Sequence, residues 1–385
     1  RGVAFHHAEI GGLEPGTTYF YQVFSDGVPG RYDRYHPGSF TSLRPPAAKP
    51  LFEFAILADI HIGEDVSGSP AVPTYRASPE DDYSTAMARA AVAEINGRGV
   101  DFTMLPADNS NHGSRHDLED AKAILDGLER PYVIARGAHD RPKQYEEAVE
   151  ECGADGDCFR AVFFPERPAG AQPQHIYYAY DTGRKSRYVV IALDSANLDT
   201  GTGELSDEQL AWLDRKLTET DRGNVPVFIF FHHPVSEWST TLAVPPLVFG
   251  VNQQDAQEFL QIVGRHDSVR TIVNSHTHRN WISYSPWTGR VPILEVGPSK
   301  EYPGGYSIIR AYRDGFTRTF HRLRCEFCRR WIETTRWEYA GNYPHYTTGS
   351  LRDRNFVHRW DRPDVPAGPP SLPFNPWPPF VPMEA

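Results

Sequence analysis

Two short polar segments, far apart in the chain, constrain its fold more than any other feature. Asp59-Ile60-His61 follows the apolar run Ile56-Leu57, and His276-Thr277-His278 follows Thr271-Ile272-Val273. Residues at i and i+2 of an extended chain point to the same side, and open α/β sheets place their ligands at the carboxyl ends of strands. Either segment alone could be ordinary surface polarity, with Asp59 capping the segment after it. Together they predict a metal site where the ends of two buried strands meet.

The size and charge of the chain exclude some classes of protein. Its 385 residues exceed the usual size of one domain, so we expect one large catalytic domain with appended segments. The formal net charge of −11 argues against broad binding to a phosphate backbone, so no nucleic-acid polymer is expected as a partner. The most apolar run, 225–231, has the length of a strand, and no membrane span is expected.

The cysteines form two local pairs, Cys152 with Cys158 and Cys325 with Cys328. Small disulfide loops suit both pairs and predict a secreted, periplasmic or cell-surface protein. Reduced buried thiols or a four-cysteine zinc site are the alternatives, although the spacing of the first pair fits a zinc knuckle poorly. The chain begins at Arg1, so no export signal can be read from it.

The two ends of the chain differ in pattern from its middle. Strands are expected at 4–10, 19–23 and 39–41, which resemble the last three strands of a fibronectin type III sandwich. Three strands are too few for a sandwich, so the sheet needs upstream residues or another element to complete it. A partner chain could bind there or at the proline-rich tail. The expected organisation is 1–44 as this incomplete β domain, 45–50 as a linker, 51–325 as the catalytic domain, and 326–385 as a C-terminal extension with the tail.

Between these ends, strands alternate with helices, which predicts a layered α/β domain. The expected strands are 52–58, 102–106, 131–135, 187–193, 225–231, 291–296, 306–312 and 316–323. The expected helices are 81–96, 117–129, and one that starts with a capping box at Ser206-Asp207-Glu208-Gln209. The arginines of 318–336, mixed with glutamates, favour a solvated strand face.

Three more strand ends carry polar side chains: Asp108-Asn109 after Leu105, His139-Asp140 after Ala135, and His232-His233 after Phe231. In chain order the segments resemble the blocks Asp-x-His, Gly-Asp, Gly-Asn-His-Asp/Glu, His-x-Pro and Gly-His-x-His of the calcineurin-like metallophosphoesterases. The resemblance covers about 51–325. The stretches 177–181, 191–195 and 302–306 also resemble extracellular, purple-acid-phosphatase-like members. The resemblance implies two mixed β-sheets flanked by helices.

The resemblance also implies roles for individual residues. The implied metal ligands are Asp59, His61 and His278 for one ion, His232 and His276 for a second, and Asp108 between the two. His139 would protonate the leaving oxygen, and Asp140 would orient it. One or two divalent ions (Mn, Zn, Fe or Co) suit such ligands. The implied activity is hydrolysis of a small phosphomonoester or phosphodiester by metal-activated hydroxide.

The departures from the family pattern affect the second ion most. Ala138 stands where the family has a metal-ligating Asn, and a methyl group can neither bind metal nor hydrogen-bond phosphate. Asn109, Asn111 or His112 could replace the lost ligand, or the second ion could bind weakly. The third reading is a degenerate member that serves as a binding or structural subunit of an extracellular assembly.

Two smaller departures and two further candidates complete the comparison. Ala107 and Ser275 replace family glycines and are expected to be tolerated because both are small. His233 and Asn109 are candidate substrate contacts. Residues 109–116 contain no Tyr, which argues against an Fe(III)-tyrosinate centre.

Overall fold

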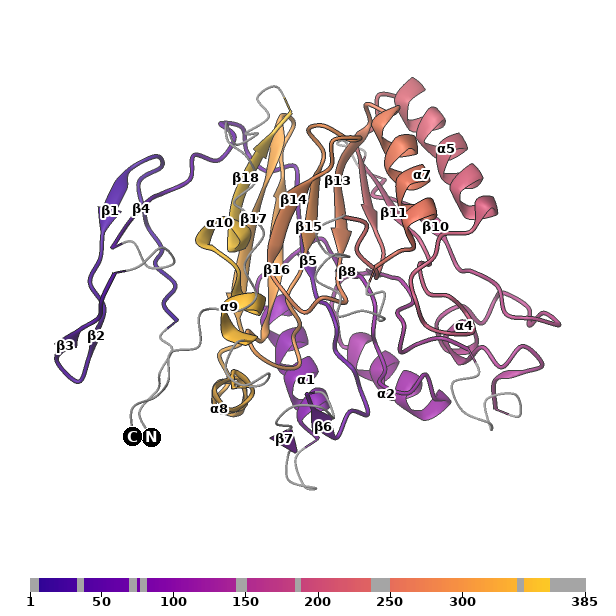
Figure 1. Cartoon of the computed structure of the whole chain (residues 1–385), viewed down its shortest axis with the longest axis horizontal. Helices are drawn as coiled ribbons and strands as arrows, with labels where there is room; N and C mark the ends of the chain where they lie inside the picture. The colour runs from indigo at the N-terminus through magenta and orange to yellow at the C-terminus, as the bar shows by residue number, and fades with distance from the viewer. Residues whose placement is uncertain are drawn as a thin grey trace.

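The centre of the molecule is a pair of six-stranded sheets with helices on both outer faces (Figure 1). This confirms the predicted layered α/β class. The computed structural model describes residues 7–32, 38–68, 75–76, 82–142, 151–183, 188–236, 250–337 and 343–360. The proline-rich tail that follows residue 360 lies outside the described residues.

The first sheet has a parallel centre. Its strands, in spatial order, are β10 (Tyr178–Asp181), β11 (Val189–Ala192), β12 (Val227–Phe230), β13 (Val269–Asn274), β15 (Pro292–Glu295) and β14 (Trp281–Tyr284). Strands β11, β12, β13 and β15 are parallel, and β10 and β14 are antiparallel edges. The central strands are covered on both faces, which explains why β11 and β12 are continuous apolar runs.

The second sheet is half parallel and half antiparallel. Its strands, in spatial order, are β18 (Asn355–Arg359), β17 (Gly315–Arg322), β16 (Gly305–Ala311), β5 (Phe52–Ile56), β8 (Phe102–Leu105) and β9 (Tyr132–Ile134). Strands β5, β8 and β9 are parallel, whereas β16, β17 and β18 are antiparallel. The carboxyl ends of β5, β8 and β9 therefore lie at one edge of this sheet.

Three apolar clusters hold the layers together. One lies between the sheets and includes Phe54, which stacks on Phe102 with ring centroids 4.7 Å apart. A second lies under α1 (Tyr83–Asn96), α2 (Arg115–Leu125), α4 (Cys158–Phe163) and α8 (Glu326–Thr335). The third lies under α5 (Asp207–Arg222) and α7 (Gln253–Gly264). Each fully buried Phe stabilises the fold by about 1.5–3 kcal/mol, so these clusters fix the relative positions of the strand ends.

Helix α5 begins where the sequence predicts, but without the expected reciprocal cap. Ser206 Oγ accepts a hydrogen bond from the Gln209 N–H at 3.4 Å. The Gln209 side chain turns instead to Asp194, where it accepts from the backbone N–H at 2.7 Å and donates to the carbonyl oxygen at 2.9 Å. One buried amide thus satisfies both backbone groups of Asp194 and ties α5 to the end of β11.

The arginine-rich stretch 318–336 does not form a solvated strand face, so that prediction was wrong. Arg318 lies on β17 but is fully buried, and it donates to Asn280 Oδ1 at 2.6 Å. The chain then turns into α8, where Trp331 stacks on Tyr83 with ring centroids 4.3 Å apart. Further elements that the sequence did not predict are α4, α7, β10, β14 and β18, and the short α9 (Tyr343–Thr348), α10 (Leu351–Arg354), β6 (Val66–Ser67) and β7 (Tyr75–Arg76).

The N-terminal segment forms two small sheets beside the main body (Figure 1). β1 (Thr18–Phe20) pairs antiparallel with β4 (Ser39–Thr41), and β2 (Phe24–Ser25) pairs with β3 (Val28–Pro29). Residues 7–10 of the expected first strand are not in a strand, and residues 4–6 lie outside the described part. The likeness to a fibronectin type III sandwich and the proposed domain boundaries stay predictions.

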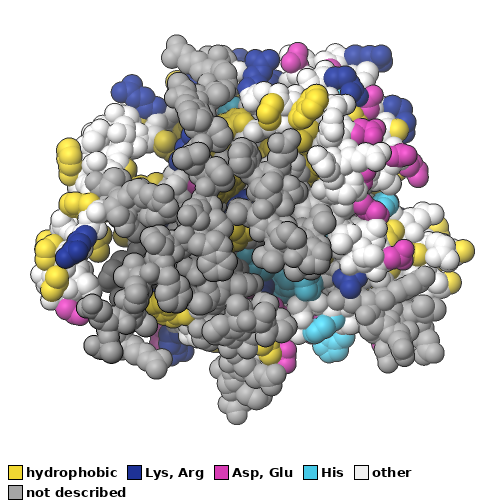
Figure 2. All heavy atoms as spheres, viewed as in Figure 1, with side chains coloured by type: hydrophobic (Ala, Val, Ile, Leu, Met, Phe, Trp, Pro, Cys, Tyr) yellow, Lys and Arg dark blue, Asp and Glu magenta, His cyan; other side chains and the backbone are white. Residues whose placement is uncertain are grey.

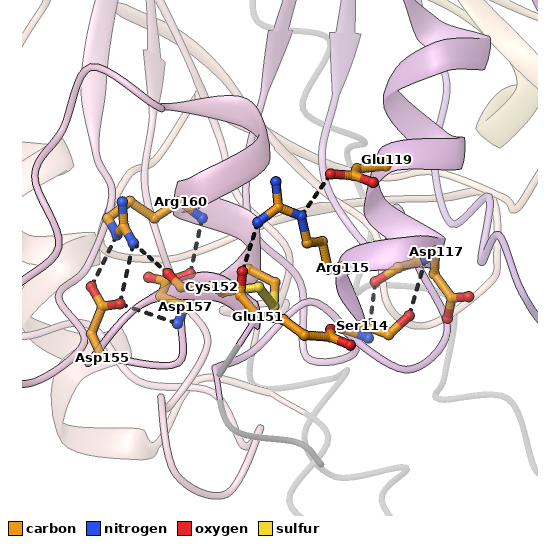
Figure 3. Close-up of a disulfide and its surroundings, with 12 residues drawn as sticks. Ser114, Arg115, Asp117, Glu119, Glu151, Cys152, Asp155, Asp157 and Arg160 are labelled. Carbon is orange, nitrogen blue, oxygen red and sulfur yellow. Dashed lines mark hydrogen bonds and ion pairs between the residues drawn. A yellow bond between two sulfur atoms is a disulfide. The ribbon is translucent and has the colours of Figure 1, made fainter. Parts of the chain in front are cut away.

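Both predicted disulfides are present, Cys152–Cys158 and Cys325–Cys328, so the four-cysteine zinc site is excluded. Figure 3 shows the first bond beside α2, where Arg115 donates to the carbonyl oxygen of Glu151 at 2.6 Å. The disulfide joins Cys152 to the start of α4, and the Arg115 hydrogen bond joins the adjacent Glu151 to α2. In the part of the chain that the structure describes, every helix is too short or too polar to cross a membrane.

Candidate metal centre

The predicted ligands meet at the carboxyl ends of the parallel strands of both sheets. Those that follow β5, β8 and β13 have left-handed backbones: φ is 49° at Asp59, 44° at His61, 47° at Asp108, 67° at His276 and 50° at His278. Non-glycine residues rarely adopt this conformation, and each instance costs about 1–3 kcal/mol. Such strain gathers at functional sites, so these left-handed residues mark this edge of the sheets as a candidate site.

Asp108 lies between two groups of ligands. Its Oδ2 is 3.4 Å from His61 Nε2 and 3.2 Å from His232 Nε2. On one side, Asp59 Oδ1 lies 3.7 Å from His278 Nε2. We call Asp59, His61 and His278 the first half-site.

On the other side of Asp108, His232 Nε2 is 2.9 Å from His276 Nδ1. We call His232 and His276 the second half-site. The two half-sites are also joined through the backbone, because the His276 N–H donates to Asp59 Oδ1 at 3.2 Å. The structure thus brings all six predicted ligands together.

The atoms at the centre suit a divalent cation. Asp59 Oδ2 and His61 Nε2 are buried and have no hydrogen-bond partner among the described residues, which is costly unless an ion binds them. Ligand atoms of the first half-site all lie within 4.8 Å of one another, as do those of Asp59, Asp108 and His232. The residues therefore fit the dimetal centre that the sequence pattern implies.

The charge states of the ligands agree with this fit. Burial lowers the pKa of the His61 and His276 imidazoles well below their usual value, so both are neutral, as metal ligands must be. Burial alone would raise the pKa of Asp108, but the imidazoles of His232 and His139 hold it well below its usual range. Burial raises the pKa of Asp59 to about 6, a shift that a bound cation would reverse.

A buried acidic and basic cluster supports His278, and sequence reasoning missed it. Glu301 Oε1 accepts from His278 Nδ1 at 2.7 Å, and Glu301 Oε2 accepts from Lys300 Nζ at 3.0 Å and from Ser67 Oγ at 2.8 Å. Lys300 also binds Glu64. A carboxylate behind a ligating imidazole fixes its tautomer and raises its basicity. The sequence signal was only a Lys-Glu pair beside the stretch 302–306.

Ser275 supports His232 in the same way. Its Oγ lies 3.0 Å from His232 Nδ1 and donates to the carbonyl oxygen of Pro106 at 3.1 Å. With Nδ1 hydrogen-bonded, His232 directs Nε2 at Asp108. A family glycine could not make this contact, so the substitution that was expected to be merely tolerated adds a support.

His139 lies beside Asp108 at the partly exposed side of the site. Its backbone N–H donates to Asp108 Oδ1 at 2.9 Å, and its ring Nδ1 donates to the carbonyl oxygen of Asn111 at 2.8 Å. Asp140 accepts hydrogen bonds from the N–H groups of Asn109 and Gly137 at 3.0–3.1 Å. Asp140 therefore holds together the loops that carry Asp108 and His139, and a direct role in orienting His139 stays a prediction.

Ala138 leaves the second half-site without the expected amide. The Asn109 amide nitrogen is directed at Asp140 Oδ2, at 2.9 Å, and at the carbonyl oxygen of Ala135, at 3.2 Å. Asn111 Oδ1 faces His61 Nδ1 at 3.4 Å, on the side of the first half-site. His112 Nδ1 faces Asp117 at 2.9 Å. These contacts favour a second half-site with fewer ligands over a replacement from the 109–112 loop.

His233 is held by the protein through both ring nitrogens. Nδ1 lies 3.0 Å from Ser195 Oγ, and Nε2 lies 3.1 Å from the carbonyl oxygen of Gly201. Burial lowers the pKa of His233 to about 3, so the ring is neutral. A contact between His233 and a substrate would require one of these hydrogen bonds to break.

The site opens on one side of the molecule. His139, His276 and His278 are partly exposed, whereas Asp59, Asp108 and His232 are buried. Figure 2 shows histidine side chains gathered on the viewed face. A ligand would therefore approach past the exposed histidines and meet the carboxylates behind them.

Comparisons with known proteins agree with this geometry. The family model of calcineurin-like phosphoesterases matches residues 52–280. A probable cyclic nucleotide phosphodiesterase of Synechococcus sp. is 26% identical over 61% of this chain and 82% of its own length. Purple acid phosphatase 22 of Arabidopsis thaliana is 23% identical over 71% of this chain and 52% of its own length. The chain belongs to the calcineurin-like phosphoesterase family.

A solved structure supports the fold. A dimetal phosphatase from Danio rerio superposes with a TM-score of 0.54 at 15% identity, over 72% of this chain and 98% of that one. At this identity the likeness shows the fold alone. The two six-stranded mixed sheets flanked by helices are thus the metallophosphoesterase fold.

Proposed function

We propose that this calcineurin-like phosphoesterase hydrolyses a small phosphomonoester or phosphodiester at the centre around Asp108. The observation that carries the proposal is a pair of buried atoms, Asp59 Oδ2 and His61 Nε2, that have no hydrogen-bond partner in the part of the chain that the structure describes. They lie beside Asp108, whose carboxylate faces both His61 and His232. The family of the chain and the names of its relatives support phosphate-ester hydrolysis as the reaction.

The chain's own groups would bind, orient and transfer a proton. Divalent ions, when bound, neutralise phosphate charge and lower the pKa of a water. Asp59, His61 and His278 would hold one ion, His232 and His276 the other, and Asp108 both. Mixed carboxylate and imidazole ligands suit Mn, Zn, Fe or Co.

His139 is proposed as the general acid. Its Nδ1 donates to the Asn111 carbonyl oxygen, which fixes the direction of the ring. Nε2 is the atom proposed to protonate the leaving oxygen. Asp140 would act at a distance, by holding the loop on which His139 sits. The two disulfides support an exported location for the reaction.

The test is metal content together with turnover. We expect purified protein to bind a transition metal and to hydrolyse p-nitrophenyl phosphate or bis-p-nitrophenyl phosphate after loading with Mn, Zn or Co. Chelation should abolish the activity, and adding the metal back should restore it. Protein that neither binds metal nor turns over either ester would sink the proposal.

The alternative is a catalytically degenerate family member that serves as a binding or structural subunit and does not turn over substrate. Ala138 is the observation that favours it. Ala138→Asn separates the readings. A weak second ion predicts higher metal occupancy and faster turnover in this variant. A degenerate binding or structural subunit predicts no turnover in either form, even at full metal occupancy.

A further inference from the structure

Arg141 lies beside the second half-site, close to the place where the family amide is missing. It follows Gly137-Ala138-His139-Asp140 directly, and its Nη1 donates to the carbonyl oxygen of Ala138 at 2.9 Å. This bond turns the guanidinium back over the turn that carries Ala138. The guanidinium therefore lies against the backbone of the residue that departs from the family pattern.

A second loop confines the same guanidinium. A Cβ built on Gly201 would lie 2.7 Å from Arg141 Nη1 and 3.3 Å from its Cζ, so the guanidinium packs directly against this glycine. The Gly201 carbonyl oxygen accepts from His233 Nε2 at 3.1 Å. The His233 ring in turn lies 4.7 Å from the His276 ring. Arg141 thus sits between the Ala138 turn and the loop that borders the second half-site.

The positive charge of Arg141 has no counterion of its own among the described residues. No described carboxylate lies within 4.0 Å of it, whereas Arg136 on the preceding strand end pairs with both Asp157 and Asp194. Burial lowers the pKa of Arg141, and the negative charge of Asp108 partly offsets this by raising it. Among the described residues, the Arg141 guanidinium donates one hydrogen bond, to the Ala138 carbonyl oxygen. A guanidinium carries five N–H groups, so it can also bind an anion.

We propose that Arg141 binds non-bridging oxygens of the substrate phosphate and so replaces the phosphate contact that Ala138 cannot make. The proposal rests on the proposed phosphoesterase function. A guanidinium matches phosphate in shape and charge and can donate two parallel hydrogen bonds. It cannot replace the amide as a metal ligand, because it has no acceptor atom.

The proposal predicts a dependence on substrate charge. A phosphomonoester dianion carries one more negative charge than a phosphodiester, so loss of the guanidinium should weaken the monoester more. A charge-assisted hydrogen bond corresponds to about 10- to 100-fold in affinity. Arg141→Gln should lower kcat/KM by that factor for p-nitrophenyl phosphate, and by about 10-fold or less for bis-p-nitrophenyl phosphate.

Inorganic phosphate gives a readout that does not depend on turnover. Calorimetry on the metal-loaded protein should show phosphate binding about 10- to 100-fold weaker in Arg141→Gln than in the wild type, with unchanged metal content. Arg141→Lys should recover part of the loss, since it restores charge without the planar fork. Arg265→Gln is the matched control, because Arg265 is an exposed arginine of the α7 end that pairs with Asp214.

The outcomes separate this proposal from the proposed function. Equal phosphate affinity in wild type and Arg141→Gln, at equal metal content and equal thermal stability, overturns the role of Arg141 even if the enzyme is active. A wild type that binds no phosphate overturns it as well. Weaker phosphate binding in Arg141→Gln, in a protein that hydrolyses neither ester, supports Arg141 while it refutes catalysis.

Discussion

Replacing Glu301 by glutamine should weaken metal binding at the first half-site by about 10- to 100-fold. Glu301 is 2% exposed and accepts the 2.7 Å hydrogen bond from His278 Nδ1. Glutamine keeps the shape and can still accept that bond, but it removes the negative charge that raises the pKa of the imidazole against the effect of burial. His278 would then be a weaker base and a poorer ligand.

The expected loss corresponds to about 1.4–2.7 kcal/mol of metal-binding free energy. The free energy of unfolding should also fall, because Lys300 loses one of its two carboxylate partners. Lys300 is 3% exposed and keeps its ion pair with Glu64. Removing a buried polar partner costs about 1–3 kcal/mol, so the variant should remain folded but melt earlier. Metal affinity must therefore be measured well below the melting temperature.

Competition with a chelator of known affinity gives the metal dissociation constant directly. Glu119→Gln is the matched control, since it removes the same charge from an exposed side chain of α2. Ser67→Ala takes one hydrogen bond from Glu301 and should give a smaller effect in the same direction. If Glu301→Gln lowers the melting temperature but leaves the metal dissociation constant within twofold of wild type, Glu301 supports only the fold.

Three further sets of substitutions test the stability of the fold and do not depend on catalytic activity. Ala107 has φ of 122°, a conformation that suits glycine, so Ala107→Gly should raise the free energy of unfolding by about 1 kcal/mol in urea denaturation; a loss would contradict the strain. Burial lowers the pKa of His358 to about 4, so its contribution to stability is complete above pH 6.5 and is lost as the pH falls toward 4. His358→Gln should therefore lessen the fall in unfolding free energy between pH 7 and pH 5 by about 2 kcal/mol, and an unchanged pH slope would argue against this protonation. Replacing Cys152 and Cys158 by Ser opens a loop with a sequence separation of 6 and should cost about 2 kcal/mol of unfolding free energy, whereas no change in melting temperature would show that the loop is held by other contacts.

The candidate metal ligands could be found from the sequence because their signal is local. Asp59 with His61, and His276 with His278, each follow an apolar strand, and parallel strands bring their carboxyl ends to one edge. The strain that accompanies these ligands could not be foreseen, because it depends on how each turn meets its neighbours. Ala107 illustrates this limit: its small size suggested tolerance, but its φ of 122° is a glycine conformation.

The supports of the site were hidden because they join residues far apart in sequence. Glu301 reaches His278 across 23 positions, and Ser67 reaches Glu301 across 234. Gln209 follows the same rule, since its local pattern predicted a cap but a buried Asp194 backbone offered two partners at once. Where a long-range partner is buried and otherwise unsatisfied, it outweighs the local pattern.

Asp108 couples the two half-sites, because one carboxylate faces a histidine of each. One oxygen accepts from the His139 backbone, and the other stands between His61 and His232. A shift of this carboxylate toward one histidine is a shift away from the other, so substitutions in opposite half-sites should not have independent effects. Double-mutant cycles between His61 and His232 should show coupling, as expected for groups that share one partner. A lineage that altered one half would thereby change which substitutions the other half can accept.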